Sequence, residues 1–150
     1  MTQSVAHYVR IAPSEPLPDI AGFAPFKAIV VLDSSYTGDW QSEVSDWLVS
    51  SGCRYMMAWG PASTTWDDSV DWSDLAARKF KEDDSRFVMT TWHDDETLEN
   101  AFWYSQFCAN FSYDDVELTN ALIVDVSDVD RETEMLALFE QSKTLAERES

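Results

Sequence analysis

The chain has few glycines and few cysteines, and both shortages limit its chemistry. Its four glycines, in 150 residues, never come close enough together for the G-x-G-x-x-G or P-loop motifs that cradle phosphate groups. Its two cysteines, Cys53 and Cys108, stand 55 positions apart and form no CxxC or Cys/His pair. We therefore expect two buried free thiols. No metal or cofactor is predicted.

Basic side chains are scarce as well. Ten Lys and Arg face 28 Asp and Glu, which gives a formal net charge of −18. Such a surface repels the phosphates of nucleic acid and of anionic membranes, so both partners are excluded. No apolar run approaches the roughly 20 residues that cross a bilayer, and the N-terminal residues do not form a signal-peptide pattern. We expect a cytoplasmic protein.

Apolar residues make up 45% of the chain and aromatic residues 13%, which suffices for the core of one ordinary domain. Four of the five prolines fall within residues 1–25. This predicts an extended N-terminal arm, in which His7–Ile11 is suited to one edge strand. Residues 26–150 are predicted to form a single α/β domain.

Hydrophobic periodicity in that domain alternates between strands and helices. Strands are predicted at 26–32, 54–59, 86–91 and 118–126, and helices at 40–52, 66–80, 95–109 and 131–147. Strands joined through helices are mostly parallel. The predicted fold is a three-layer α/β sandwich around a mostly parallel, four- to five-stranded sheet with flavodoxin-like or Rossmann-like order.

Polar residues follow each predicted strand, and parallel strands bring these ends to one edge of the sheet, where ligands bind in such folds. The candidate catalytic residues there are Asp33, His93 and Asp125. Three interpretations remain open, and each assigns these ends a different task. In the first, Asp33, Asp94 or Asp125 binds Mg²⁺. In the second, Ser34 or Ser35 attacks a substrate, with His93 as the general base and Asp125 or Asp94 as the residue that orients His93. In the third, these ends have no chemical role, and Asp94, Asp95, Ser127 and Asp128 only cap helices.

The negative charge is concentrated in two regions. Residues 28–77 contain eight acidic residues against Arg54 alone, and residues 87–130 contain ten with no Lys or Arg. The few bases gather at Arg78, Lys79, Lys81 and Arg86. Seven tryptophans exceed what one small core uses, so some are expected at the surface. An acidic, aromatic face favours a non-catalytic module that covers a basic protein, of the inhibitor, immunity or adaptor type.

The segments GCRYMMAWGP (52–61) and RFVMTTWHDDETLENAFW (86–103) resemble an uncharacterised family of small bacterial proteins with CRYxxAWG and FVMTTWHxDE motifs. The resemblance covers roughly residues 26–145 and implies bacterial origin and a shared cleft. Together with the acidic surface, it selects the following residues for ligand or partner binding: Arg54, Trp59, Trp92, His93, Asp94 and Glu96. It also draws attention to Cys53 and Gly60. The predicted 95–109 helix has a wider apolar surface than packing against one sheet uses, which allows a homodimer to form through this helix.

Overall fold

The strand β2 (Phe26–Leu32) lies at the centre of the sheet, and all seven of its residues are buried. Apart from Lys27, its side chains are all apolar, and such a strand requires cover on both faces. The computed structural model describes residues 4–77 and 88–149. It places five parallel strands in the order β1-β5-β2-β3-β4. The other four are β1 (Val5–Ile11), β3 (Cys53–Trp59), β4 (Met89–His93) and β5 (Asn120–Val126).

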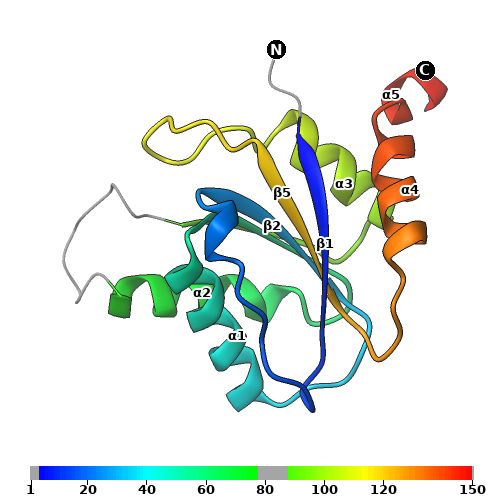
Figure 1. Cartoon of the computed structure of the whole chain (residues 1–150). Coiled ribbons are helices and arrows are strands. Elements are labelled where there is room, and N and C mark those ends of the chain that lie inside the picture. Colours follow the sequence, from blue (N-terminus) through cyan, green and yellow to red (C-terminus); the bar gives the residue numbers. More distant parts are fainter. Residues whose placement is uncertain (1–3, 78–87, 150) are drawn as a thin grey trace.

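Two helical layers enclose this sheet, one on each face (Figure 1). One layer holds α1 (Gly38–Ser51) and α2 (Thr64–Ala77), which pack on a core containing Val30, Met56 and Val124. The opposite layer holds α3 (Leu98–Phe107) and α4 (Glu132–Ser142), which pack on Ile29, Met57 and Ile123. A short helix, α5 (Leu145–Glu149), follows α4, and one 3₁₀ turn, η1 (Ala21–Phe23), precedes β2.

The predicted three-layer, parallel α/β architecture is therefore confirmed. The expected edge strand is present, and as β1 it pairs with β5 along its whole length. Gly52 ends α1 in the left-handed conformation at φ 104°, as a helix-terminating glycine does. The predicted 131–147 helix is divided into α4 and α5.

The position of the third predicted strand was wrong. The third strand was expected at 86–91, but β4 runs from Met89 to His93, so Trp92 and His93 belong to a strand rather than to the following loop. Residues 86 and 87 lie outside the described residues, as do Arg78, Lys79 and Lys81. The buried face of α2 carries Trp66 and Val70, whereas Trp72 is 65% exposed, in line with the expectation that some tryptophans lie at the surface.

The direction of the chain across the sheet reverses beside β2. From β2 the chain proceeds through β3 to β4, then crosses the other face through α3 to β5, on the opposite side of β2. Ligands in open α/β sheets bind outside the carboxyl ends of the strands at such a reversal. Here that position lies between the ends of β2 and β5, at Asp33 and Asp125.

Candidate functional site

The candidate residues at the carboxyl edge form two separate clusters. Asp125, Val31, Trp59 and His93 lie in one row across four neighbouring strands. Adjacent strands are about 4.8 Å apart, so the backbones of Asp125 and His93 are separated by about 14 Å. We describe them as the Asp125 cluster and the His93 cluster.

In the Asp125 cluster, Arg131 joins two carboxylates. Its guanidinium donates to both oxygens of Asp125, at 2.5 and 3.1 Å, and lies 2.9 Å from the Asp33 carboxylate. The Tyr8 hydroxyl donates to Asp125 at 2.7 Å and accepts the backbone N–H of Arg131 at 2.9 Å. Asp125 is fully buried, whereas half of the Asp33 side chain is exposed.

These contacts give the Asp125 cluster a consistent electrostatic character. The hydrogen bond to Asp125 raises the pKa of Arg131 against the opposing effect of burial, and Asp33 adds to the increase. Burial, followed by the hydrogen bond to Asp125, raises the pKa of Tyr8 to about 12. Arg131 engages the carboxylate oxygens that Mg²⁺ would need, so the cluster has the character of a structural ion pair between β2, β5 and the start of α4.

In the His93 cluster, the imidazole is held between a hydroxyl and a carboxylate. Nε2 lies 2.9 Å from the Thr91 hydroxyl, and Nδ1 contacts the Glu96 carboxylate. Thr91 and His93 are two positions apart on β4, so their side chains share one face of the strand. His93 is only 8% exposed, and its ring centroid lies 4.9 Å from that of Tyr104 on α3.

Glu96 is fixed from three directions. One carboxylate oxygen contacts His93, and the other accepts a hydrogen bond from the Asn100 side chain. The Trp59 indole donates to the Glu96 carbonyl at 2.8 Å. A carboxylate restrained in this way holds the imidazole in one orientation. Three of the residues selected for binding, Trp59, His93 and Glu96, therefore do come together.

The helix-capping interpretation is wrong, because none of the four residues that it names caps α3 or α4. The N-cap of α3 is Thr97, whose hydroxyl accepts from the Asn100 N–H at 3.1 Å, and not Asp94 or Asp95. Glu99 lies in the first turn of α3, where a negative charge is favourable. Before α4, the Ser127 hydroxyl accepts a turn N–H from Val129, whereas Arg131 occupies the N-cap position without a side-chain cap.

A cavity of about 320 Å³ opens beside the His93 cluster. Thr91, His93 and Tyr104 line it, together with Thr90 and Trp92. Tyr104 exchanges a 2.6 Å hydrogen bond with the hydroxyl of the buried Tyr55 on β3. Burial, followed by this hydrogen bond, raises the pKa of Tyr55, so the Tyr55 hydroxyl stays protonated at neutral pH.

The remaining candidates lie elsewhere. Ser34 and Ser35 line a different hollow, of about 660 Å³, with Tyr36, Pro61 and Thr65, so the proposed Ser–His arrangement is not assembled. Arg54 is the second residue of β3 and lies near the amino-terminal ends of the strands, whereas His93 lies at their carboxyl ends. Trp92 is 51% exposed, and Asp94 is exposed on the turn that follows β4.

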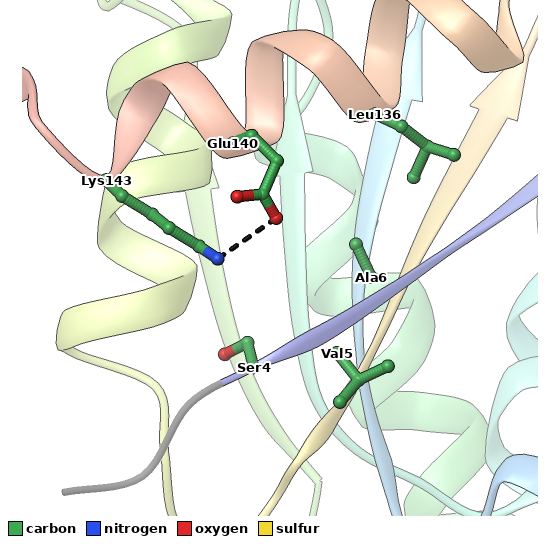
Figure 2. Close-up of a pocket in the computed structure, with 6 residues that line it drawn as sticks. All are labelled: Ser4, Val5, Ala6, Leu136, Glu140 and Lys143. Carbon is green, nitrogen blue, oxygen red and sulfur yellow. Dashed lines mark hydrogen bonds and ion pairs between the residues drawn. The ribbon is translucent and has the colours of Figure 1, made fainter.

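Two further hollows lie outside the Asp125 and His93 clusters. One, of about 520 Å³, is bounded by the start of β1 and by α4, where Lys143 and Glu140 form a 3.0 Å ion pair (Figure 2). The other is a groove of about 580 Å³ between α1 and α2, which we call the α1–α2 groove. It is lined by Gln41, Ser42, Asp46, Thr65, Asp68, Ser69, Trp72, Ser73 and Ala76.

The chain therefore forms a three-layer α/β protein with a parallel sheet, in which the direction of strand addition reverses beside the central strand β2. The family model described as a domain of unknown function (DUF7684) matches residues 6–142, and the chain belongs to this family. No curated protein and no solved structure matches the chain. No helix in the described part of the chain is long and apolar enough to cross a membrane.

Sequence reasoning missed Arg131, Thr91 and Tyr104. Arg131 was taken only as the start of a helix, although it is the first basic residue after a long acidic region. Thr91 and His93 show the alternation of a strand, which would have paired them had the third strand been extended to residue 93. Tyr104 was read only as apolar surface, and no local pattern indicates its contact with Tyr55.

Proposed function

We propose that this protein binds a basic partner protein through the α1–α2 groove. The two helices carry seven acidic residues and no Lys or Arg within their spans. Asp46 from α1 and Asp68 from α2 line the groove from its two sides. Arginine and lysine side chains of a partner are the groups that complement such a surface.

The observation that carries the proposal is a carboxylate cluster on α2. Oxygens of Asp67, Asp68 and Asp71 lie within 4.8 Å of one another. Burial raises the pKa of Asp71, and its acidic neighbours add to the increase, against a hydrogen bond from Thr90. One buried oxygen of Asp67 has no hydrogen-bond partner among the described residues. A partner's cationic side chain would relieve this repulsion.

An exposed tryptophan stands next to these charges. Trp72 lines the groove and leaves 65% of its surface accessible. Tryptophan is enriched among the residues that dominate binding energy at interfaces, and its ring also attracts guanidinium and ammonium groups. The groove therefore combines an apolar anchor with the negative charge of Asp46 and Asp68, as expected of an inhibitor, immunity or adaptor protein.

We further propose that the protein acts in a bacterial cytoplasm. Both cysteines are free thiols, which fits a reducing compartment. Cys53 is buried as expected, but the prediction for Cys108 was wrong, because this thiol is exposed. Homodimer formation through the apolar surface of α3 stays a prediction, and Phe107 on that surface is 49% exposed.

A titration with a labelled nona-arginine peptide tests the groove. Fluorescence anisotropy at low salt would compare the wild type with the double variant Asp46→Asn/Asp68→Asn. Each lost ion pair weakens binding by about 0.2–1 kcal/mol. We therefore expect the two together to raise Kd about fivefold. Trp72→Ala should weaken binding as well, without changing the net charge.

The matched control is Glu132→Gln/Glu134→Gln, which removes two exposed charges from α4 in the other layer. Its Kd should change by no more than about twofold, because only the long-range field is reduced. Equal weakening by both double variants would contradict binding at the groove. Failure of the wild type to bind the peptide at low salt would overturn the proposal of a basic partner.

A further inference from the structure

We propose that the His93 cluster is an acyl-transfer site that hydrolyses small uncharged esters. In it, Thr91 is the nucleophile, His93 the general base and Glu96 the residue that positions His93. The three side chains are joined in one chain of hydrogen bonds, and two of them line the 320 Å³ cavity. This site shares no residue with the α1–α2 groove, so the inference is independent of the proposed partner.

The hydrogen-bond partners determine where the protons lie. A carboxylate only accepts hydrogen bonds, so Nδ1 of His93 carries the hydrogen that Glu96 receives. In the neutral ring Nε2 is then an acceptor, and the Thr91 hydroxyl donates to it across 2.9 Å. A hydroxyl that donates to a fixed imidazole, with a carboxylate behind it, is the arrangement that activates an oxygen nucleophile.

A second group is available to stabilise negative charge on a substrate. Tyr55 and Tyr104 share one hydrogen bond, which uses one of their two hydroxyl hydrogens. When the buried Tyr55 donates, the hydrogen of Tyr104 is left for the cavity that Tyr104 lines. Preformed donors of this kind stabilise the oxyanion of a tetrahedral intermediate.

The position of β4 at the sheet edge supplies another donor. The carbonyl of His93 accepts the N–H of Gly60 at 3.3 Å, so the backbone of His93 is turned toward the β3 side. Backbone groups alternate in direction along a parallel strand, so the N–H of Trp92 points to the open edge. Among the residues described, β4 has no neighbouring strand on that side. A substrate carbonyl at this edge would meet both Trp92 N–H and Tyr104.

The reaction then proceeds in two balanced steps. Thr91 Oγ1 attacks the ester carbonyl while Nε2 of His93 takes the hydroxyl proton. The C–O bond to the alcohol breaks, and the alcohol leaves with that proton. Water then attacks the acyl-Thr91 ester, and His93 takes a proton from the water. Collapse of the intermediate releases the carboxylic acid and returns the proton to Thr91.

The surroundings select the class of substrate. Asp94 and Asp95 are exposed on the turn after β4 and oppose the approach of anions. Trp92 and Tyr104 contribute apolar walls, and the volume suits a small acyl group with a modest alcohol. A neutral ester such as p-nitrophenyl acetate is therefore a suitable probe.

The experiment measures release of p-nitrophenol and the mass of the intact chain after rapid acid quenching. The wild type should show a burst and one acetyl group on the peptide containing Thr91. Thr91→Val should abolish both, whereas Thr91→Ser should restore them. Thr119→Val is the matched control, because Thr119 is exposed just before β5, near the amino-terminal ends of the strands and away from the cavity. It should leave the burst unchanged.

Variants of the other two residues separate base and positioning roles. His93→Gln should slow acylation about a hundredfold. Glu96→Gln should lower kcat for the ester while leaving KM unchanged, since the neutral amide no longer positions the imidazole whereas the cavity keeps its lining. A purely structural role would change both constants or neither. Circular dichroism melting would establish that each variant is folded.

Two outcomes would overturn the proposal. The first is a wild-type protein with no acetyl group on the Thr91 peptide under burst conditions. The second is a folded Thr91→Val protein that releases p-nitrophenol as fast as the wild type, since the ester would then be cleaved by another surface group.

Discussion

Replacing Arg131 by methionine tests whether the Asp125 cluster is a structural ion pair. Methionine keeps most of the length of the arginine stem but removes all three contacts to Asp125 and Asp33. Asp125 is fully buried, so the substitution leaves a carboxylate enclosed with only Tyr8 as a hydrogen-bond donor among the contacts described above. We expect a large loss of stability.

The magnitude follows from the burial of the two carboxylates. Removing one member of a buried ion pair destabilises a protein by about 3–5 kcal/mol. Asp33 contributes about 1 kcal/mol or less, because 54% of its side chain is exposed and its pair is screened by solvent. Asp125 therefore dominates. Since native proteins are stable by about 5–15 kcal/mol, the variant loses roughly a third of its stability and about 10 °C in Tm.

Urea unfolding of four proteins measures the effect. Arg131→Met should lose about 3–5 kcal/mol. The double variant Arg131→Met/Asp125→Asn should recover most of this loss, because its buried group is uncharged. Lys143→Met is the matched control: it removes the same charge from an exposed pair with Glu140 and should change stability by less than about 1 kcal/mol. A loss of under about 1 kcal/mol for Arg131→Met, or no recovery in the double variant, would refute the reasoning.

Two further predictions concern buried groups. Burial lowers the pKa of Lys27 from 10.5 to about 8, so the unfolded chain binds more protons between these values. The stability of the wild type relative to Lys27→Met should therefore rise by about 3 kcal/mol from pH 8 to 10.5. Urea unfolding across this range would contradict the expectation if the difference stayed flat. With a thiol reagent, native protein should react once per chain, at the exposed Cys108. Burial raises the pKa of Cys53 to about 12, so a native Cys108→Ser variant that still reacted would exclude this assignment.

The architecture was predictable because it depends on patterns that tertiary packing reinforces. The apolar run of β2 fits a strand covered on both faces, and the structure buries it completely. The run 118–126 and the helix from 40 to 52 agree with β5 and α1 within two residues at each end. Strands separated by helices leave little choice other than parallel pairing.

The location of β4 was harder to predict because its sequence is less apolar. Met89, Thr90 and Thr91 are only partly buried, as residues of an edge strand are, and Trp92 is half exposed. Periodicity alone does not separate such a strand from a loop. The shift of the strand end changed the composition of the candidate site, since it placed His93 on the same face of β4 as Thr91.

The composition of the site depended on contacts that are distant in sequence. Asp33 and Asp125 were correctly expected at one edge, but the residue that joins them is Arg131. Likewise, Tyr55 and Tyr104 lie on a strand and a helix, 49 positions apart. Such pairings result from the packing of the two helical layers on the sheet, and no local sequence motif predicts them.

The way in which the chain compensates its negative charge distinguishes the two surfaces. At the carboxyl edge, Asp125 contacts Arg131 and Tyr8, and Glu96 contacts His93 and Asn100. These carboxylates already have donors from within the chain, so they fix geometry rather than attract a cation. On α2 the carboxylates of Asp67, Asp68 and Asp71 lie within 4.8 Å of one another. Because like charges held this close destabilise the folded chain, a cationic partner would gain affinity by removing that repulsion. Association through the α1–α2 groove should therefore weaken steeply as added salt screens the carboxylates, whereas cleavage of a neutral ester at Thr91 should respond little to salt.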